Sequence, residues 1–379
     1  MIKEPTLQGN LFDSKAQTLV NTVNCEGIMG KGIALEFKKR FPEMFQDYVK
    51  RCEHGEVRLG KPYLYRHKEL FQPWIINFPT KDTWRSVTKL SDIIAGLEYL
   101  LKNYKNWGIT SIAVPPLGCG LGQLEWKVVG PTLYRYLNRM DIPVELFAPY
   151  DTSYKELQPE FLKEAGIPID IANSSINHKW IKPSWIALVE ILNRIEEQPF
   201  HWPVGRTIFE KIAYVATEEG LPTDLIFEKK SYGPYSLETP KLESKLVNNG
   251  LIEVRKKGKM YEFKVGKTFA DARKAYDKDL KQWENIINKV VDLFMRVDTD
   301  LAEVVATVIY AARSLHHNDL SKPSEMDVLE YIREWKIRRK PQFKDEEVGL
   351  TIRSLAAFGW IDVLASDDLP VPEEEFIGV

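Results

Sequence analysis

The sequence predicts an α/β protein with a layered sheet in its first part and a mostly helical second part. Short apolar runs alternate with amphipathic helices over residues 1–150, as in layered α/β folds. Two of these runs end in glycine-bearing loops that open directly onto helices. Beyond residue 184, helical periodicity dominates. A chain of 379 residues is long enough for two or three domains.

The first glycine-bearing loop lies within residues 21–34, NTVNCEGIMGKGIA, between an apolar strand and a helix. Glycine permits backbone angles closed to other residues and lets a ligand approach the main chain. The first N–H groups of the helix are free to bind an anion. A tight turn without a ligand has the same glycine spacing, so the context must decide. Here the context favours a phosphate site.

A second loop of the same kind follows the strand 111–114 and precedes a helix that starts near Trp126. Between the two loops lies a third strand, 74–78, which ends in NFPTK, so that Lys81 leaves the sheet nearby. Ligands of α/β proteins bind at the carboxyl ends of strands. We therefore expect both loops and Lys81 to face one cleft.

The remaining elements of the first part are predicted as scaffold. Apolar stripes indicate helices over 33–41, 42–52, 90–104 and 126–137, with Phe45, Val49 and Cys52 on the second. A last strand is expected at 144–148, and the chain start, MIK, is expected to lead into a strand.

The segments VNCEGIMGKGIA, NFPTK and PPLGCGLGQLEW occur in one order over roughly residues 1–150. Together they resemble the macrodomain of the DarG antitoxins, which is related to the vertebrate terminal ADP-ribose glycohydrolase. The resemblance implies a three-layer α/β/α fold with a mixed sheet that binds ADP-ribose. It also implies ADP-ribosylated DNA as substrate, cleaved at thymidine, ADP-ribose as product and the toxin DarT as partner. No cofactor and no metal are expected.

The resemblance implies a set of residues that bind ADP-ribose. Asn10 falls where many macrodomains place an aspartate that reads adenine, and its amide oxygen can still accept that hydrogen bond. Tyr150 is placed to stack on adenine, although it reads equally well as an exposed loop tyrosine. The other members lie next to Asn10, in the first loop, in NFPTK and in the second loop: Leu11, Asn24, Gly27, Met29, Gly30, Gly32, Ile33, Ala34, Thr80, Gly118, Cys119, Gly120, Leu121 and Gly122.

Lys81 matches the catalytic lysine of this branch. The resemblance implies that its amine attacks the anomeric carbon of the ribose and forms a Schiff-base-like adduct, which water releases. The attacking amine must be neutral, whereas a lysine in free solution has a pKa of about 10.4. The alternative is a lysine that only pairs with phosphate.

Gly122 is a departure from the vertebrate relative, which has a catalytic aspartate there in the pattern GCGLD. The second loop therefore supplies no carboxylate as acid or base. Glu125 is expected inside the following helix, so the role is not transferred to it. The lysine route is preferred.

We predict a macrodomain over 1–155, a connector over 156–183 and a toxin-binding domain over 184–379. Helices 185–195, 207–215 and 240–248, a turn at 231–236 and strands 251–255 and 260–265 indicate a winged-helix-like unit over 184–270. Helices at 267–297, 301–315, 325–338 and 346–358 are expected to complete a helical region, 271–379, with an acidic tail.

Two interpretations of this second part stay open. Basic residues on the hairpin favour a DNA-reading module, whereas 209–252 weakly resembles Panacea-type antitoxin domains, which neutralise toxins. Residues 345–379 carry nine acidic residues and one basic residue. Such a tail is either a solvated, disordered end or a surface that fills the basic groove of the toxin by mimicking DNA.

Charge and cysteine content bound the remaining possibilities. Residues 1–150 carry 20 Lys and Arg against 15 Asp and Glu, a net charge of +5 that suits a polyanionic substrate. Three cysteines make no disulfide framework, and no signal or membrane segment is found, so a cytoplasmic protein is expected. Two other functions stay open: a hydrolase of ADP-ribose on protein glutamate, and a non-catalytic ADP-ribose reader fused to a DNA-binding domain.

Overall fold

The computed structural model describes residues 6–67, 72–164, 181–258, 260–318 and 322–372. The chain forms two compact units, Met1–Ser175 with Glu243–Asn249 and Ile176–Leu242 with Gly250–Val379. The strand expected at the chain start and most of the expected connector lie outside the described residues.

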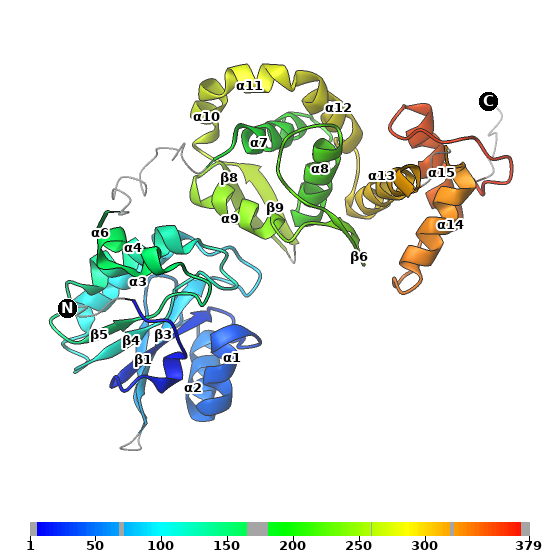
Figure 1. Cartoon of the computed structure of the whole chain (residues 1–379). Helices are drawn as coiled ribbons and strands as arrows, with labels where there is room; N and C mark the ends of the chain where they lie inside the picture. The colour runs from blue at the N-terminus through cyan, green and yellow to red at the C-terminus, as the bar shows by residue number, and fades with distance from the viewer. Residues whose placement is uncertain (1–5, 68–71, 165–180, 259, 319–321, 373–379) are drawn as a thin grey trace. The chain divides into compact units, whose positions relative to one another are not determined.

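A five-stranded sheet in the order β2-β3-β1-β4-β5 forms the centre of the first unit (Figure 1). Strands β1, β3, β4 and β5 are parallel, and β2 runs antiparallel to β3. This confirms the mixed sheet, and the carboxyl ends of the parallel strands meet at one edge. The bounds are β1 (Thr18–Asn24), β2 (Tyr63–Tyr65), β3 (Trp74–Lys81), β4 (Ile112–Val114) and β5 (Val144–Leu146).

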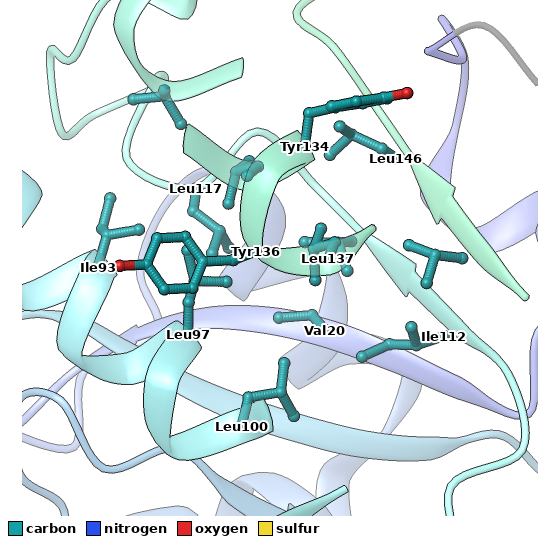
Figure 2. Packing of buried hydrophobic residues seen from close by; sticks show 14 of the residues in the cluster. Val20, Ile93, Leu97, Leu100, Ile112, Leu117, Tyr134, Tyr136, Leu137 and Leu146 are labelled. Carbon is teal, nitrogen blue, oxygen red and sulfur yellow. The ribbon is translucent and has the colours of Figure 1, made fainter. Parts of the chain in front are cut away.

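Helices cover both faces of this sheet. Helices α3 and α4 pack on one face, and Figure 2 shows Leu97, Leu100 and Leu137 lying over Val20 of β1 and Ile112 of β4. Helices α1 and α2 pack on the other face. The helical bounds are η1 (Leu11–Asp13), α1 (Gly32–Arg40), α2 (Pro42–Glu53), α3 (Leu90–Asn103), α4 (Trp126–Leu137), α5 (Tyr154–Leu157) and α6 (Pro159–Glu164).

The first unit has one hydrophobic core on each face of the sheet, because successive side chains of a strand point to opposite faces. Val20 belongs to the core beneath α3 and α4, whereas its neighbour Leu19 and Val23 belong to the core beneath α1 and α2. Burying each such side chain is worth about 1.5–3 kcal/mol. The expected three-layer arrangement therefore follows from strands that are apolar on both faces.

Strand β3 is longer than expected: it continues through Pro79 to Lys81. The expectation that the strand stops at Phe78 was wrong. Strand β2 pairs with β3 only as far as Asn77, so beyond that residue no strand of the described part of the chain pairs with this side of β3. A proline, which lacks an N–H donor, is tolerated at such a position.

The second unit is mostly helical, as expected. The helices expected near 185–195, 207–215 and 240–248 and the hairpin that follows are all present (Figure 1). The bounds are α7 (Pro183–Glu196), α8 (Arg206–Glu218), β6 (Glu228–Lys230), β7 (Gly233–Tyr235), β8 (Ile252–Lys257), β9 (Met260–Val265), α10 (Phe269–Ala275), α11 (Asp277–Gln282), α12 (Glu284–Phe294), α13 (Thr299–Asn318), α14 (Glu325–Lys336) and α15 (Asp345–Ala357). Helix α9 (Thr239–Asn248) is divided, because its residues from Glu243 onward belong to the first unit.

One expectation for this unit was wrong, and another held in part. The single helix expected over 267–297 is three helices, α10 to α12, which break at Tyr276 and Trp283. All three contact α7, so the chain bends around that buried helix instead of running straight. The turn expected at 231–236 is present at Ser231 and Tyr232, whereas Gly233–Tyr235 form strand β7, which pairs with β6.

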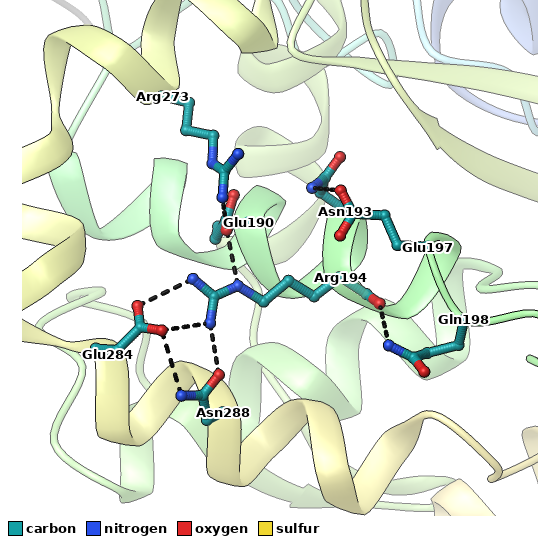
Figure 3. Close-up of polar contacts among 8 residues, drawn as sticks. All are labelled: Glu190, Asn193, Arg194, Glu197, Gln198, Arg273, Glu284 and Asn288. Carbon is teal, nitrogen blue, oxygen red and sulfur yellow. Dashed lines mark hydrogen bonds and ion pairs between the residues drawn. The ribbon is translucent and has the colours of Figure 1, made fainter.

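A polar network joins α7 to α12 (Figure 3). Arg194 donates hydrogen bonds of 2.8 and 2.9 Å to the two carboxylate oxygens of Glu284, and one of 2.7 Å to Glu190. Arg273 also donates to Glu190, which is fully buried. Such two-pronged pairing of a guanidinium fixes the relative orientation of the helices.

Part of the acidic stretch is ordered. Asp345 accepts a hydrogen bond of 2.7 Å from Arg333, and Asp362 pairs with Lys322. The run Glu373, Glu374 and Glu375 lies outside the described residues. Among the residues with described positions, no helix is both long and apolar enough to span a membrane.

Candidate active site

Asn24, the last residue of β1, organises the first loop. Its side-chain amide donates to the carbonyl of Ile28 at 2.7 Å, and its Oδ1 accepts from the N–H of Glu26 at 2.9 Å. Tyr48 of α2 donates its hydroxyl to the Asn24 carbonyl at 2.9 Å. Gly27 within the loop has a φ of +82°, which favours glycine. These contacts therefore define the shape of the loop.

Helix α1 begins directly after this loop. Its N-cap residue, Lys31, is extended and makes no side-chain capping hydrogen bond. The first backbone N–H groups of α1, from Gly32 to Ala34, are therefore not satisfied by that side chain and can bind an anion.

The second loop closes on itself. The N–H of Leu124 donates to the Gly118 carbonyl at 3.0 Å, and Gly118 has a φ of +77°. A Cβ at Gly122 would lie 2.3 Å from the Gly118 oxygen and 2.5 Å from the Thr88 hydroxyl. No side chain fits at Gly122 in this loop, so the aspartate of the vertebrate relative has no counterpart there.

Glu125 does not replace that aspartate. It is the N-cap residue of α4 with extended backbone, so its expected position inside the helix was wrong. The reason is that the tight turn through Gln123, which has a φ of +61°, delays the start of the helix.

Lys81 lies where the two loops meet. It is the last residue of β3 and pairs with Asn24 of the adjacent strand β1. Its Nζ donates a hydrogen bond of 2.6 Å to the carbonyl of Leu121 in the second loop. The Leu121 side chain in turn would lie 3.8 Å from a Cβ at Gly32 of the first loop. The strand end and both loops thus form one site.

Gln8 joins the two segments expected to hold adenine. Its side-chain amide donates to the carbonyls of Pro149, Tyr150 and Thr152 at 3.3, 3.1 and 2.8 Å. The chain before Asn10 is thereby tied to the loop that follows β5. The Asn10 amide oxygen accepts from the N–H of Phe12 at 3.2 Å and caps the short helix η1.

Residues 20–133 match the family model described as Macro domain. A solved structure, the macrodomain of Mycobacterium tuberculosis DarG, is 45% identical to this chain. That match covers 39% of this chain and 98% of the solved one, with a TM-score of 0.38. Residues 20–133 are a macrodomain.

Two curated proteins are also similar to this chain. The first, the DNA ADP-ribosyl glycohydrolase of Thermus aquaticus, is 34% identical, and the match covers 61% of this chain and 60% of that protein. The second, a DNA ADP-ribosyl transferase-DNA ADP-ribosyl glycohydrolase fusion protein of Thermosipho africanus, is 38% identical, with 42% and 46% covered. The chain thus spans about half to three-fifths of the length of these relatives. The resemblance to DarG proteins is confirmed.

Within the macrodomain, the expected binding residues differ in how far they are exposed. Asn10, Leu121 and Tyr150 are exposed, and Tyr150 keeps 77% of its surface. Leu11, Met29 and Thr80 are buried, and the Thr80 hydroxyl contacts the Val23 carbonyl. These buried side chains support the two loops and the end of β3 from the core. The remaining expected positions lie on the loops or their flanks: Asn24, Gly27, Gly30, Gly32, Ile33, Ala34, Gly118, Cys119, Gly120 and Gly122.

Sequence reasoning missed Tyr48 and Gln8, which hold the loops of the macrodomain. Met44 and Tyr48 are the residues of α2 that are fully buried, whereas Phe45, Val49 and Cys52 are only partly buried. The spacing of four between Met44 and Tyr48 was a usable signal. Nothing in the sequence around Gln8 indicates its three acceptors.

The three cysteines of the macrodomain are unpaired. Burial raises the pKa of Cys25 to about 12, with the nearby Asp82 adding to the effect. Burial also raises the pKa of Cys52 and of Cys119. Protonated thiols are poor nucleophiles, so Lys81 remains the candidate for covalent chemistry. Over the described residues, no cluster of three or more acidic, His or Cys side chains could hold a metal.

Proposed function

We propose that the macrodomain hydrolyses the glycosidic bond that joins ADP-ribose to a thymidine base in DNA. The observation that carries this proposal is the position of the Lys81 amine, 2.6 Å from the Leu121 carbonyl between the two loops. The loops offer backbone N–H groups to the diphosphate. The relative from Thermus aquaticus, named as a DNA ADP-ribosyl glycohydrolase, supports DNA as the carrier of the ADP-ribose.

The proposed reaction uses the amine as a nucleophile. The Lys81 nitrogen attacks the anomeric carbon, the carbon–nitrogen bond to the base breaks, and the base takes the proton that the amine loses. Opening of the ribose ring gives an imine between the sugar and Lys81. Water adds to the imine carbon, the bond to lysine breaks, and free ADP-ribose leaves. Gly122 supplies no acid, which is consistent with a route through the amine.

We expect Lys81→Ala to lower the rate of ADP-ribose release from an ADP-ribosylated thymidine oligonucleotide by about a thousandfold or more. ADP-ribose binding, measured by calorimetry, should change much less, because the backbone loops remain. Lys102→Ala, which removes an exposed lysine at the end of α3, is the matched control.

Full turnover by the Lys81 variant would refute the mechanism. A parallel assay with ADP-ribose ester-linked to glutamate tests the substrate class. Release from the peptide alone would contradict the assignment to DNA.

We also propose that residues from 184 onward bind and inhibit the toxin DarT. The fusion of a transferase with a glycohydrolase in the Thermosipho africanus relative supports the pairing of these activities. Large apolar side chains exposed in this part, such as Phe200, Trp202 and Tyr232, are suited to a protein interface. A chain that lacks residues 184–379 and still forms a stable complex with the toxin would refute this proposal.

A further inference from the structure

The segment that follows β3 carries an exposed aromatic side chain. Trp84 lies three residues after Lys81, and 51% of its surface is accessible. Single exposed apolar residues are common on proteins. This one is distinguished by its place beside the proposed nucleophile and by the way its backbone is fixed.

Hydrogen bonds hold this segment in one shape. The Thr83 N–H donates to the Ser86 hydroxyl at 3.2 Å, and the Ser86 N–H donates to the Thr83 carbonyl at 3.1 Å. The tryptophan is therefore carried on a closed turn, so binding a ligand there orders little additional chain.

The turn is also tied to the first phosphate loop. The N–H of Trp84 donates to a carboxylate oxygen of Glu26 at 3.1 Å, and the N–H of Cys25 donates to the Asp82 carbonyl at 3.0 Å. The backbone that carries Trp84 is thus joined to the loop that is proposed to hold the diphosphate.

Arg85 lies against the indole ring of Trp84. Its guanidinium carbon is 4.6 Å from the ring centroid, a cation–π distance. Proteins that bind single-stranded nucleic acid use aromatic side chains and arginine together, because bases stack on the ring and the cation attracts phosphate. The net charge of +5 over residues 1–150 has the matching sign.

We propose that Trp84 stacks on a nucleobase next to the modified one in single-stranded DNA, with Arg85 attracting the adjoining phosphate. This inference rests on the proposed function. In that function the modified base is bonded to the carbon that Lys81 attacks. Three residues span at most about 11 Å between Cα atoms, and stacked bases are spaced by about 3.4 Å. Trp84 is therefore within reach of the next one to three bases.

The test compares kcat/KM on two substrates, an ADP-ribosylated single-stranded oligonucleotide and the ADP-ribosylated thymidine nucleoside. We expect Trp84→Ala to lower the ratio of the first value to the second by about 5- to 150-fold, mainly through KM. Trp84→Phe should keep most of the ratio, because a phenyl ring still stacks. Arg85→Ala should weaken the salt dependence of kcat/KM on the oligonucleotide. Trp202→Ala, which removes a tryptophan that is 55% exposed in the second unit, is the matched control.

An unchanged ratio for Trp84→Ala would overturn the inference. So would an equal loss on both substrates, since that result would mean that Trp84 merely supports the cleft. If the wild-type chain hydrolyses neither substrate, the proposed function fails instead. The affinities of Trp84→Ala and the wild type for the same modified oligonucleotide then decide the inference, where a weaker variant supports it and equal affinities overturn it. The value of kcat/KM on a duplex with the same modification shows whether the enzyme requires a single-stranded substrate.

Discussion

Gly122 shows how one residue determines the chemistry of the second loop. Its missing side chain lets the loop fold back so that the Gly118 oxygen would lie only 2.3 Å from a Cβ at Gly122. Gly122→Ala should therefore force the loop open, at a cost of about 1–3 kcal/mol in stability. We expect the affinity for ADP-ribose, measured by calorimetry, to fall at least about tenfold.

Gly120→Ala is the control for this change. A Cβ there meets no atom within 4 Å, so a variant at Gly120 should keep the stability of the wild type. Wild-type affinity in Gly122→Ala would show that the loop is not held as tightly as the contacts indicate.

Sequence patterns could predict residues whose backbone or chemistry is special, and missed those whose role depends on packing. Lys81 and the loop glycines follow from the order of strands, loops and helices. The burial of Met29, by contrast, depends on how the first loop lies against α1 and α2. The support of Asn24 by Tyr48 joins residues 24 positions apart in the chain. No local pattern contains such a contact.

At the scale of elements, Gln8 joins the segment before η1 to the loop after β5. Gln8→Ala removes three hydrogen bonds to carbonyls, each worth about 0.5–1.5 kcal/mol or less at an exposed site. We expect the affinity for ADP-ribose to fall about 3- to 10-fold, because Asn10 and Tyr150 are no longer held near each other. Binding of ribose 5-phosphate, which lacks adenine, should not change.

Calorimetry with both ligands measures this effect. Gln158→Ala, which removes one hydrogen bond to the carbonyl of Tyr154, is the control. If the Gln8 variant lost affinity for both ligands equally, Gln8 would support the whole site and not its adenine end.

The existence of elements was predictable, whereas their ends were set by neighbours. Strand β3 runs on to Lys81 because it stays paired with its neighbour β1 as far as Asn24. The stretch 267–297 reads as one amphipathic helix, yet it breaks at Tyr276 and Trp283 so that each piece packs on α7. The hydrophobic periodicity of a segment does not show where in the fold the surface lies against which that segment packs.

At the scale of the whole molecule, the division into a basic α/β part and a helical part follows from composition and periodicity alone. The stability of the helical part depends on features that composition does not show. One is a buried ion cluster: Glu303, which is 4% exposed, accepts hydrogen bonds from Lys336 at 2.8 Å and from Arg339 at 3.0 Å. Buried charges of this kind stabilise only while every partner is present.

The protonation of Glu303 gives this cluster a defined pH dependence. Burial alone would raise the pKa of this carboxyl, but the hydrogen bonds from Arg339 and Lys336 outweigh burial and hold its pKa below the usual value. A depressed pKa in the folded state means that the stabilisation is present above the pKa of the unfolded chain, about 4.3. It is lost as the pH falls through the still lower folded value.

Glu303→Gln should therefore lower the free energy of unfolding of the second unit by about 3–5 kcal/mol near neutral pH. The difference from the wild type should shrink below about pH 4. Denaturant unfolding with and without ADP-ribose measures this, because the ligand should stabilise only the unfolding transition of the macrodomain. Glu330→Gln, at an exposed position of α14, is the control. If Glu303→Gln lowered the ligand-sensitive transition by the same amount, the two units would unfold together, and hydrolysis could not be treated as a property of the macrodomain alone.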